Sequence, residues 1–292
     1  MLKSPLARFL IWRMGLSVDD PETANRVYLE KLSAELGESR RVQKAVLLAM
    51  DGVYGDDGRL DEARTDFLIA NDCVLEASRK DPRFLAGVSV NPMRRDAVDE
   101  LERCAAGGAR LVKVLPNAQS FDPADRRHLP FYRTLARLKI PILTHVGFEF
   151  SLIGQDQSVG DVSRWRAALD EGARLIAAHG CSNGVFFGEK HFPTMIEFVR
   201  KYPHFFVDTS ALTLPNRAGA LFKLRRHPEL FDRLLFGTDY PLSVFSMPAL
   251  GSGSPSKYLE ARRQTCRFDR QAAVLDALGV PLGLDFEALF AR

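Results

Sequence analysis

The sequence predicts an α/β domain built around a parallel β-sheet. From residue 41 onward, short apolar runs alternate with helical patterns, an arrangement typical of βαβ units. Most of the apolar runs are nearly continuous in Val, Ile, Leu, Ala and Phe, as expected for strands covered on both faces. The 292 residues, of which 46% are hydrophobic and 26% charged, suffice for a large buried core. We therefore expect a single domain over residues 1–292.

Seven segments are expected to form the strands of this sheet. They are residues 41–50, 84–92, 109–117, 140–147, 174–180, 204–210 and 233–241. A helix is predicted over 95–107, because apolar residues recur at helical spacing there and two glycines follow. Helices near 269–278 and 286–291 should flank the domain, within residues 268–292. This periodicity suits a closed barrel and an open doubly wound sheet equally well.

Charge and cysteine spacing exclude several classes of protein. The formal net charge is only +3 and the arginines are scattered, so a nucleic-acid partner is not expected. The four cysteines lie far apart without a CxxC pair, which indicates isolated thiols and a cytoplasmic location. Arg8 and Arg13 interrupt the apolar stretch 2–14, and this pattern fits neither a signal peptide nor a membrane span. We expect the partner to be a small-molecule substrate.

Polar or ionisable residues end five of the seven predicted strands. They are Asn91, the stretch from Lys113 to Asn117, His145, His179 and Asp239. Catalytic groups of parallel α/β folds lie at the carboxyl ends of strands, so these side chains should meet at one rim. Two imidazoles and a carboxylate suit zinc or a similar divalent ion, which lowers the pKa of bound water to roughly 7. Asn91, Lys113 and Asn117 would bind the substrate.

Three of these strands carry a family resemblance. The strings PILTHVG, RLIAAHG and LLFGTDYPL, in this order, resemble strands five, six and eight of the amidohydrolase superfamily. The likeness is to the branch of uncharacterised amidohydrolases and non-oxidative decarboxylases, and it runs from about residue 20 to the end. FGTDYP is the most specific of the motifs. The resemblance implies a (β/α)8 TIM barrel and a possible homodimer.

The same resemblance implies roles for the strand-end residues. His145 would be a metal ligand, His179 a second ligand or a stabiliser of the transition state, and Asp239 a ligand and general base. The implied enzyme is a zinc-dependent hydrolase that attacks a small organic substrate with metal-activated water. The first alternative is a carbon–carbon lyase, a non-oxidative decarboxylase of a small aromatic or unsaturated acid. The second is a catalytically inactive barrel.

The sequence departs from the family pattern at its beginning. The family normally opens with a strand ending in His-x-His, which supplies two metal ligands, whereas no histidine precedes His128 here. Either the chain starts late, with the helix-like segment 4–15, or it has lost half of the metal site. Seven strands would leave two unpaired edges. Ala7 to Met14 could fill this gap as a strand, but its arginines argue against it.

Several polar residues have plainer interpretations. Asn91 and Asn117 adjoin prolines and could only shape turns. Lys113 could bridge two metals as a carboxylated lysine, but a substrate anion or a nearby carboxylate is the expected partner. Glu149 and Asp208 could also reach the rim, but they are expected to be solvated carboxylates. Four further histidines are expected at the surface: His128, His191, His204 and His227.

Overall fold

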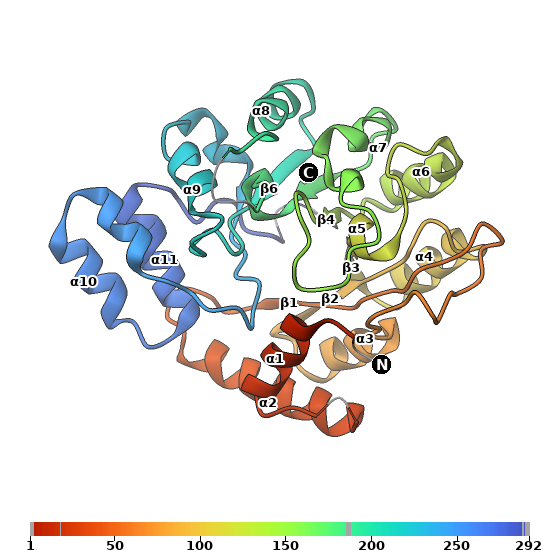
Figure 1. The fold of residues 1–292 in the computed structure, drawn as a ribbon, viewed down its shortest axis with the longest axis horizontal. Coiled ribbons are helices and arrows are strands. Elements are labelled where there is room, and N and C mark those ends of the chain that lie inside the picture. Colours follow the sequence, from red (N-terminus) through yellow and green to blue (C-terminus); the bar gives the residue numbers. More distant parts are fainter. Residues whose placement is uncertain (1–2, 18, 185–187, 288, 290–292) are drawn as a thin grey trace.

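The computed structural model describes residues 3–17, 19–184, 188–287 and 289. All seven predicted strands are confirmed, and neighbours along the chain pair in parallel to form one sheet in the order β1 to β7. They are β1 (Ala45–Leu48), β2 (Phe84–Val88), β3 (Ala109–Val114), β4 (Ile142–Thr144), β5 (Leu175–Ala177), β6 (Phe205–Asp208) and β7 (Leu234–Leu235). Because each strand joins the edge left by the previous one, the sheet curls into part of a TIM barrel (Figure 1).

Helices cover the outer face of the curled sheet. This layer is α3 (Asn71–Lys80), α4 (Ala97–Ala106), α6 (Leu129–Leu138), α7 (Arg166–Asp170), α8 (Phe192–Lys201) and α9 (Ala218–Leu224). The remaining helices are α1 (Pro5–Arg13), α2 (Pro21–Glu38), the short α5 (Pro116–Gln119), α10 (Pro255–Arg263) and α11 (Arg267–Leu278). The described residues also form six 3-10 turns: η1 (Arg126–His128), η2 (Ser158–Gly160), η3 (Val162–Trp165), η4 (Ala178–Cys181), η5 (Pro228–Arg233) and η6 (Met247–Ser252).

Helix α4 shows how the apolar periodicity produces the outer layer. Ala97, Leu101 and Cys104 recur on one face of the helix and are buried against the sheet and α6. The helix ends at Gly107, as predicted. The helix predicted near 269–278 is confirmed as α11, whereas the one predicted at 286–291 lies mostly outside the described residues.

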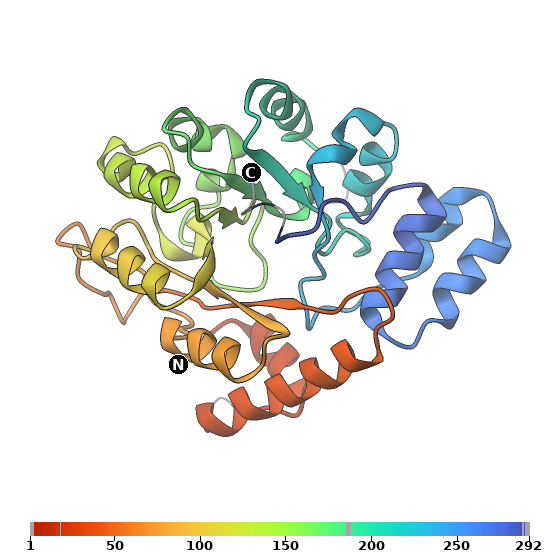
Figure 2. The same ribbon diagram turned by 180° about the vertical axis from the view of Figure 1, so that it is seen from behind.

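Among the residues that the structure describes, the sheet does not close, so β1 and β7 are its edges, as expected for seven strands. The C-terminal segment partly covers the gap, because Leu284 pairs in parallel with Leu235 and donates its N–H to Leu234 O over 2.7 Å. Leu284 and Leu289 also pack against the apolar residues inside the curled sheet. Figure 2 shows this segment on the side of the sheet opposite to the face seen in Figure 1. The interior is therefore covered from that side by the chain's own C-terminal residues.

The prediction that Ala7 to Met14 could form a strand is wrong, because these residues belong to α1 and the turn after it. Ser4 caps the helix by accepting the N–H of Ala7, and Pro5 begins it. The helix lies beside the carboxyl ends of the strands, where Ser4 Oγ donates to Ser151 O over 2.6 Å and Arg13 donates to Ser243 Oγ over 2.9 Å. No helix among the described residues is long and apolar enough to cross a membrane.

Candidate active site

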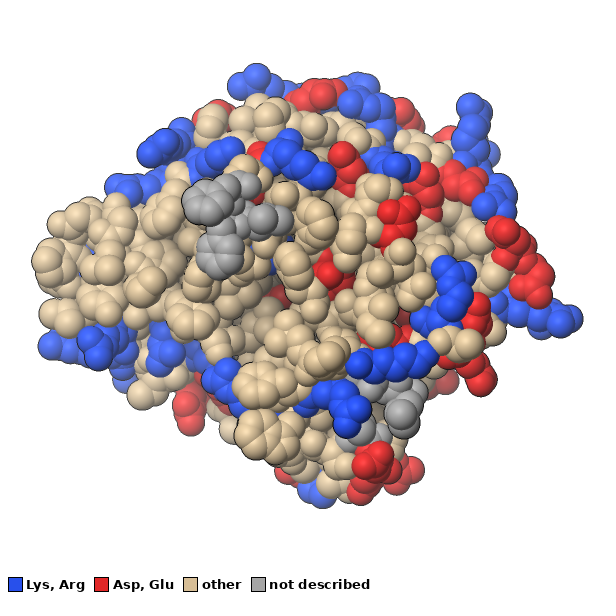
Figure 3. All heavy atoms as spheres, viewed as in Figure 1, with Lys and Arg blue, Asp and Glu red and all other residues tan. Residues whose placement is uncertain are grey.

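Three predicted site residues, His145, His179 and Asp239, follow β4, β5 and β7 and lie near one another at the carboxyl edge of the sheet. We call this part of the protein the mouth. His145 and His179 are buried with their ring centroids 5.1 Å apart, and both lie within electrostatic range of Lys113 and Arg217. Asp239 lies within range of the same two cations. Figure 3 shows a hollow near the middle of this face, with acidic atoms inside it and mostly uncharged residues around it. The strand ends therefore lie around a single hollow.

His179 is held in one orientation by β6 and the residues after it. Its backbone N–H donates to Asp208 Oδ1 over 2.8 Å, and its Nδ1 lies 2.8 Å from Ser210 Oγ and 3.1 Å from Ser210 O. Ser210 Oγ itself donates to Asp208 Oδ1, so it accepts the proton carried by Nδ1. The hydrogen bonds thus assign the proton of the neutral imidazole to Nδ1 and leave a lone pair on Nε2.

The backbone at the site adopts a conformation that side chains disfavour. His179 has a φ of +59° and Asp239 a φ of +58°, both in the left-handed region. A residue other than glycine is strained there, and such strain is concentrated at functional sites. Gly237, in the same motif as Asp239, permits the segment after β7 to lie close to the segment after β6, because a Cβ added to it would lie 3.0 Å from Ser210 Cβ.

His145 has both ring nitrogens directed at oxygen atoms of the loop that follows β4. Nε2 lies 3.1 Å from the carbonyl oxygen of Phe148 and donates to it, whereas Nδ1 lies 3.5 Å from Glu149 Oε2. Burial, together with the positive charges of Arg217 and Lys113, holds the pKa of His145 and of His179 well below the ordinary histidine range. Both imidazoles are consequently neutral near pH 7.

Two buried cations supply the positive charge of the mouth. Lys113 on β3 is 9% exposed, and Arg217, which precedes α9, is 6% exposed. Burial lowers the pKa of both groups, and the negative charge of Asp239 is the largest influence that raises it again. Within the described part of the chain neither cation forms a direct ion pair, and Arg217 reaches only carbonyl oxygens, at 3.5 Å. Sequence reasoning missed Arg217, because its loop carries no periodic signal.

Asp239 is the carboxylate of the mouth whose side chain has no hydrogen-bond partner among the described residues. Its side chain is accessible to solvent and accepts no hydrogen bond from any described residue. Desolvation of the carboxyl by the surrounding protein raises its pKa, whereas the positive charges of Lys113 and Arg217 lower it. A solvent-accessible carboxylate with a raised pKa is a better proton donor partner than an ordinary aspartate and can exchange a proton with water or a ligand.

The expectation that Glu149 and Asp208 are solvated is wrong, since both are buried. Asp208 accepts hydrogen bonds from the backbone of His179 and Ser210, and Glu149 Oε1 accepts the backbone N–H groups of Ser151 and Leu152. A third buried carboxylate, Glu189, accepts from Asn183 N over 2.9 Å. These three carboxylates therefore stabilise the loops around the mouth.

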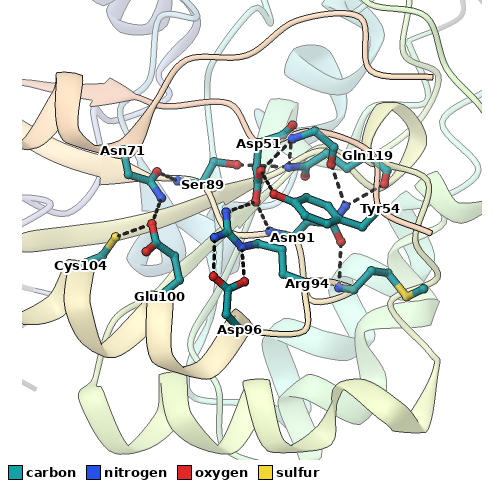
Figure 4. A network of polar contacts seen from close by, with 12 residues as sticks. Asp51, Tyr54, Asn71, Ser89, Asn91, Arg94, Asp96, Glu100, Cys104 and Gln119 are labelled. Atoms are coloured by element: carbon teal, nitrogen blue, oxygen red, sulfur yellow. Dashed lines mark hydrogen bonds and ion pairs between the residues drawn. The ribbon is translucent and has the colours of Figure 1, made fainter. Parts of the chain in front are cut away.

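The two asparagines predicted to bind substrate have no exposed surface. Asn91 donates to the carbonyl oxygens of Gly52 and Gln119, and its backbone N–H donates to Asp51 Oδ2 (Figure 4). Asn117 donates to Gln157 Oε1 over 2.9 Å and to Gly147 O over 3.2 Å. In this arrangement both hold loops together, and neither presents a surface to a ligand.

The expected surface position of the remaining histidines is only partly met. His128 and His191 are buried, so the expectation is wrong for these two. His204 and His227 are partly exposed. The aromatic neighbours of His128 explain its burial.

The residues of the mouth do not fit a catalytic metal ion. Among the described residues, no three His, Cys, Asp or Glu side chains lie close enough to hold one. His145 Nε2 already donates to Phe148 O, and Lys113 and Arg217 would repel a divalent cation. The zinc site at His145, His179 and Asp239 thus stays a prediction that this geometry does not support.

Comparison with known proteins identifies one family whose model matches most of the chain. Residues 28–251 match the family model described as Amidohydrolase. The fold is similar to an uncharacterised TIM-barrel protein from Bordetella bronchiseptica (17% identity, TM-score 0.54, covering 88% of this chain and 86% of that one). It is also similar to a probable 2-pyrone-4,6-dicarboxylic acid hydrolase from Acinetobacter baumannii with citric acid bound (14% identity, TM-score 0.59, 90% and 88%).

A weaker similarity links the chain to a 2,6-dihydroxybenzoate decarboxylase (19% identity, TM-score 0.44, covering 70% of this chain and 75% of that one). No curated protein matches the chain. At these identities the solved structures show the barrel fold alone.

Proposed function

The chain belongs to the amidohydrolase family, and from this premise we propose that it is a hydrolase that cleaves an acyl C–O or C–N bond in a small organic carboxylate. The family is metal-dependent, but the chemistry proposed for this chain uses its own side chains. The observation that carries the proposal is the pair of buried cations, Lys113 and Arg217, that face Asp239 without a direct ion pair.

The balance of open charges favours an anionic substrate. Asp208, Glu149 and Glu189 have their charge compensated by N–H and O–H donors. Among the described residues of the mouth, the charged groups without a direct ion pair are the cations Lys113 and Arg217 and the carboxylate of Asp239. Together they carry an excess of one positive charge. A buried charge without a partner is unfavourable, so a substrate carboxylate that pairs with Arg217 or Lys113 relieves this cost.

Asp239 is assigned as general base and then general acid. It accepts a proton from water as the water oxygen bonds to the acyl carbon, and the carbonyl oxygen takes up the negative charge. Lys113 or Arg217 stabilises this oxyanion electrostatically. When the C–O or C–N bond breaks, the leaving atom receives the proton from Asp239. The lone pair on His179 Nε2 accepts a hydrogen bond and orients the water.

The Acinetobacter baumannii protein was solved with citric acid, which carries three carboxyl groups. That ligand supports carboxylates as the first class to test on this chain.

The test is hydrolysis of carboxylated lactones and esters beside their uncharged methyl esters, with and without EDTA. We expect turnover of the carboxylated compounds, insensitivity to EDTA, and loss of turnover in Arg217→Gln. Equal turnover of the charged and methylated series would refute anion recognition by the cations. Loss of all activity in EDTA, restored by added metal, would refute the metal-free assignment.

Decarboxylation is the second candidate, because the raised pKa of Asp239 also suits it to donate a proton. The proton would go to the ring carbon as CO2 leaves. Release of CO2 from aromatic or unsaturated acids, without ester hydrolysis, would favour this candidate. Binding of carboxylates with turnover of neither class would favour an inactive barrel.

A further inference from the structure

Lys113 is the one buried lysine in the part of the chain that the structure describes. It is 9% exposed, whereas all the other lysines are exposed to solvent. The register of β3 explains this burial. Leu111, two residues earlier on the strand, belongs to the apolar cluster inside the curled sheet, together with Ile176 and Phe206. Because alternate residues of a strand face the same side, the side chain of Lys113 points into this interior as well.

The amino group of Lys113 has no direct partner among the described residues. On β4 its neighbour in register is Leu143, which packs against the same interior cluster. The nearby charges, led by that of Asp239, act on Nζ from a distance and not through a hydrogen bond or ion pair. A lysine that only balanced charge would pair with a carboxylate directly, as Arg94 pairs with Asp96 over 2.9 Å.

Burial also changes the chemistry of this amine. It lowers the pKa of Lys113, so the loss of a proton costs less free energy here than at an exposed lysine. A lysine that is desolvated in this way, beside another cationic group, is activated as a nucleophile toward carbonyl carbons.

Two neighbours supply what a carbonyl substrate needs beside the amine. Arg217 is a buried cation without an ion pair and lies within electrostatic range of Lys113, so it can bind a carboxylate. Asp239 lies within range of both cations and is accessible to solvent. In a small 2-oxo acid the keto carbon is bonded directly to the carboxylate. One small ligand can therefore engage the guanidinium and the amine together.

We propose that Lys113 forms an imine with the keto carbon of a small 2-oxo carboxylate held by Arg217, and that Asp239 then exchanges protons at the carbon next to the imine. This activity is separate from the hydrolysis proposed above, because it uses Lys113 as a nucleophile rather than as a charge and breaks no acyl bond.

The bond changes balance without a further reactant. Lys113 transfers one proton to Asp239, and its nitrogen lone pair forms a bond to the keto carbon. A second proton moves from the nitrogen to the former carbonyl oxygen. Asp239 returns the first proton to the same oxygen, which leaves as water as the C=N bond forms. Asp239, again a carboxylate, then removes a proton from the neighbouring carbon, and the electron pair of that C–H bond moves toward the C=N bond to give an enamine. Return of a proton from solvent reverses this last step.

The test is reductive trapping of the wild-type protein with pyruvate and cyanoborohydride at pH 7, followed by mass spectrometry of the intact protein and its peptides. We expect the mass of one reduced pyruvate on Lys113. Its labelling should exceed that of any exposed lysine by at least roughly tenfold, because exposed lysines are protonated at this pH. In Arg217→Gln, labelling by pyruvate should fall roughly tenfold, whereas labelling by the neutral ketone hydroxyacetone should not change.

A matched pair of lysine variants provides the control. Lys113→Arg keeps the positive charge but cannot form the imine, so it should lose the adduct. Lys80→Arg should keep the adduct, since the side chain of Lys80 is 73% exposed on α3. Proton NMR of pyruvate in D2O measures the second step independently. The wild type should exchange the methyl protons of pyruvate with solvent, and Lys113→Arg should not.

Three results would overturn the inference. Labelling of exposed lysines with none on Lys113 would do so in the wild type alone, without any variant that has to fold. Equal labelling of Lys113→Arg and the wild type would place the adduct elsewhere. Trapping at Lys113 without exchange of the methyl protons would remove the proton transfer assigned to Asp239. Failure to hydrolyse carboxylated esters, with trapping at Lys113 intact, would instead refute the proposed function and leave the imine site standing.

Discussion

The polar residues that follow β1 and β2 differ from those that follow β4 to β7 in how their charges are compensated. Asp51 accepts from Gly52 N, Tyr54 OH and Asn91 N at 2.8–2.9 Å and lies 3.5 Å from Arg94 Nη1 (Figure 4). Arg94 also donates to Asp96 over 2.9 Å. Nearly every group in this Asp51 network has a partner, so the network stabilises the loops.

The mouth contains the opposite arrangement. Lys113, Arg217 and Asp239 lie within electrostatic range of one another, yet among the described residues none of them forms a direct ion pair. Both groups of residues occupy the same edge of the sheet and both are rich in charge. A charged residue at a strand end can therefore have a structural or a catalytic role, and its position does not tell which. What distinguishes the two roles is whether its charge is paired with another side chain.

The largest expected effect comes from the two aspartates. Asp239→Asn should lower kcat by roughly 1,000-fold, because the amide cannot accept the proton from water, with little change in the melting temperature. Asp51→Asn should do the reverse and destabilise the fold by about 2 kcal/mol while the folded fraction keeps its kcat. Steady-state kinetics and thermal unfolding of both variants measure this, and a large kcat loss in Asp51→Asn would break the comparison.

The two arginines provide the next contrast. Arg217→Gln should lower kcat/KM by roughly 100-fold, since it removes a cation from the substrate carboxylate and the oxyanion. Arg94→Gln should change kcat/KM by less than about threefold and lower the melting temperature, because its partners Asp51 and Asp96 are structural. Equal effects on kcat/KM in the two variants would contradict the division of roles.

Glu100 tests the pH dependence of the supporting region. Its hydrogen bonds with Arg103 and with Asn71 lower its pKa to about 2 from an ordinary value of 4.5. A lowered acid pKa means that the unfolded chain binds the proton first, so this contribution exists above pH 4.5 and is lost as pH falls toward 2. Urea unfolding near pH 5 and near pH 3 should show a smaller loss of stability in Glu100→Gln than in the wild type. If the variant and the wild type lost the same stability between the two pH values, Glu100 would not be a source of acid sensitivity.

The smallest effect is expected at His128. The ring is buried with centroids 5.8 Å from Phe121 and 6.4 Å from Tyr132, and neither nitrogen has a partner among the described residues. Burial lowers its pKa, so the unfolded chain takes up the proton first and stability falls as pH drops below about 6.5. His128→Phe should raise the free energy of unfolding by up to about 1 kcal/mol and weaken this pH dependence. A variant less stable than the wild type at pH 7 would show that the ring has an unseen partner.

Much of the fold could be predicted because its cause is local. Each buried parallel strand needs a nearly continuous apolar run, and all seven runs became strands. The predicted ends extended too far, since segments such as 233–241 include loop residues after a strand of only two residues, Leu234–Leu235. Segment 7–14 was ambiguous because its apolar residues suit a strand or a helix, and the cap at Ser4 decided for the helix.

The candidate site was predictable only where a residue lies at the end of a strand or a few residues after it. Lys113 lies near the end of β3, and His145, His179 and Asp239 follow β4, β5 and β7. Arg217 does neither, because it lies between β6 and α9 in a loop without periodicity. The burial of Glu149 and Asp208 could not be predicted either, since it depends on N–H donors that the folded loops supply.

The sequence by itself determined which side chains reach the carboxyl edge of the sheet, because chain direction and strand order are properties of successive βαβ units. Only the tertiary structure decided what those side chains do there. The proton position on His179 depends on Ser210, 31 residues away, and the carbonyl oxygen of Phe148 lies near Arg217, 69 residues away. Chemistry at a site depends on the directions of lone pairs and hydrogen atoms, and these are set by contacts that form only when distant segments fold together.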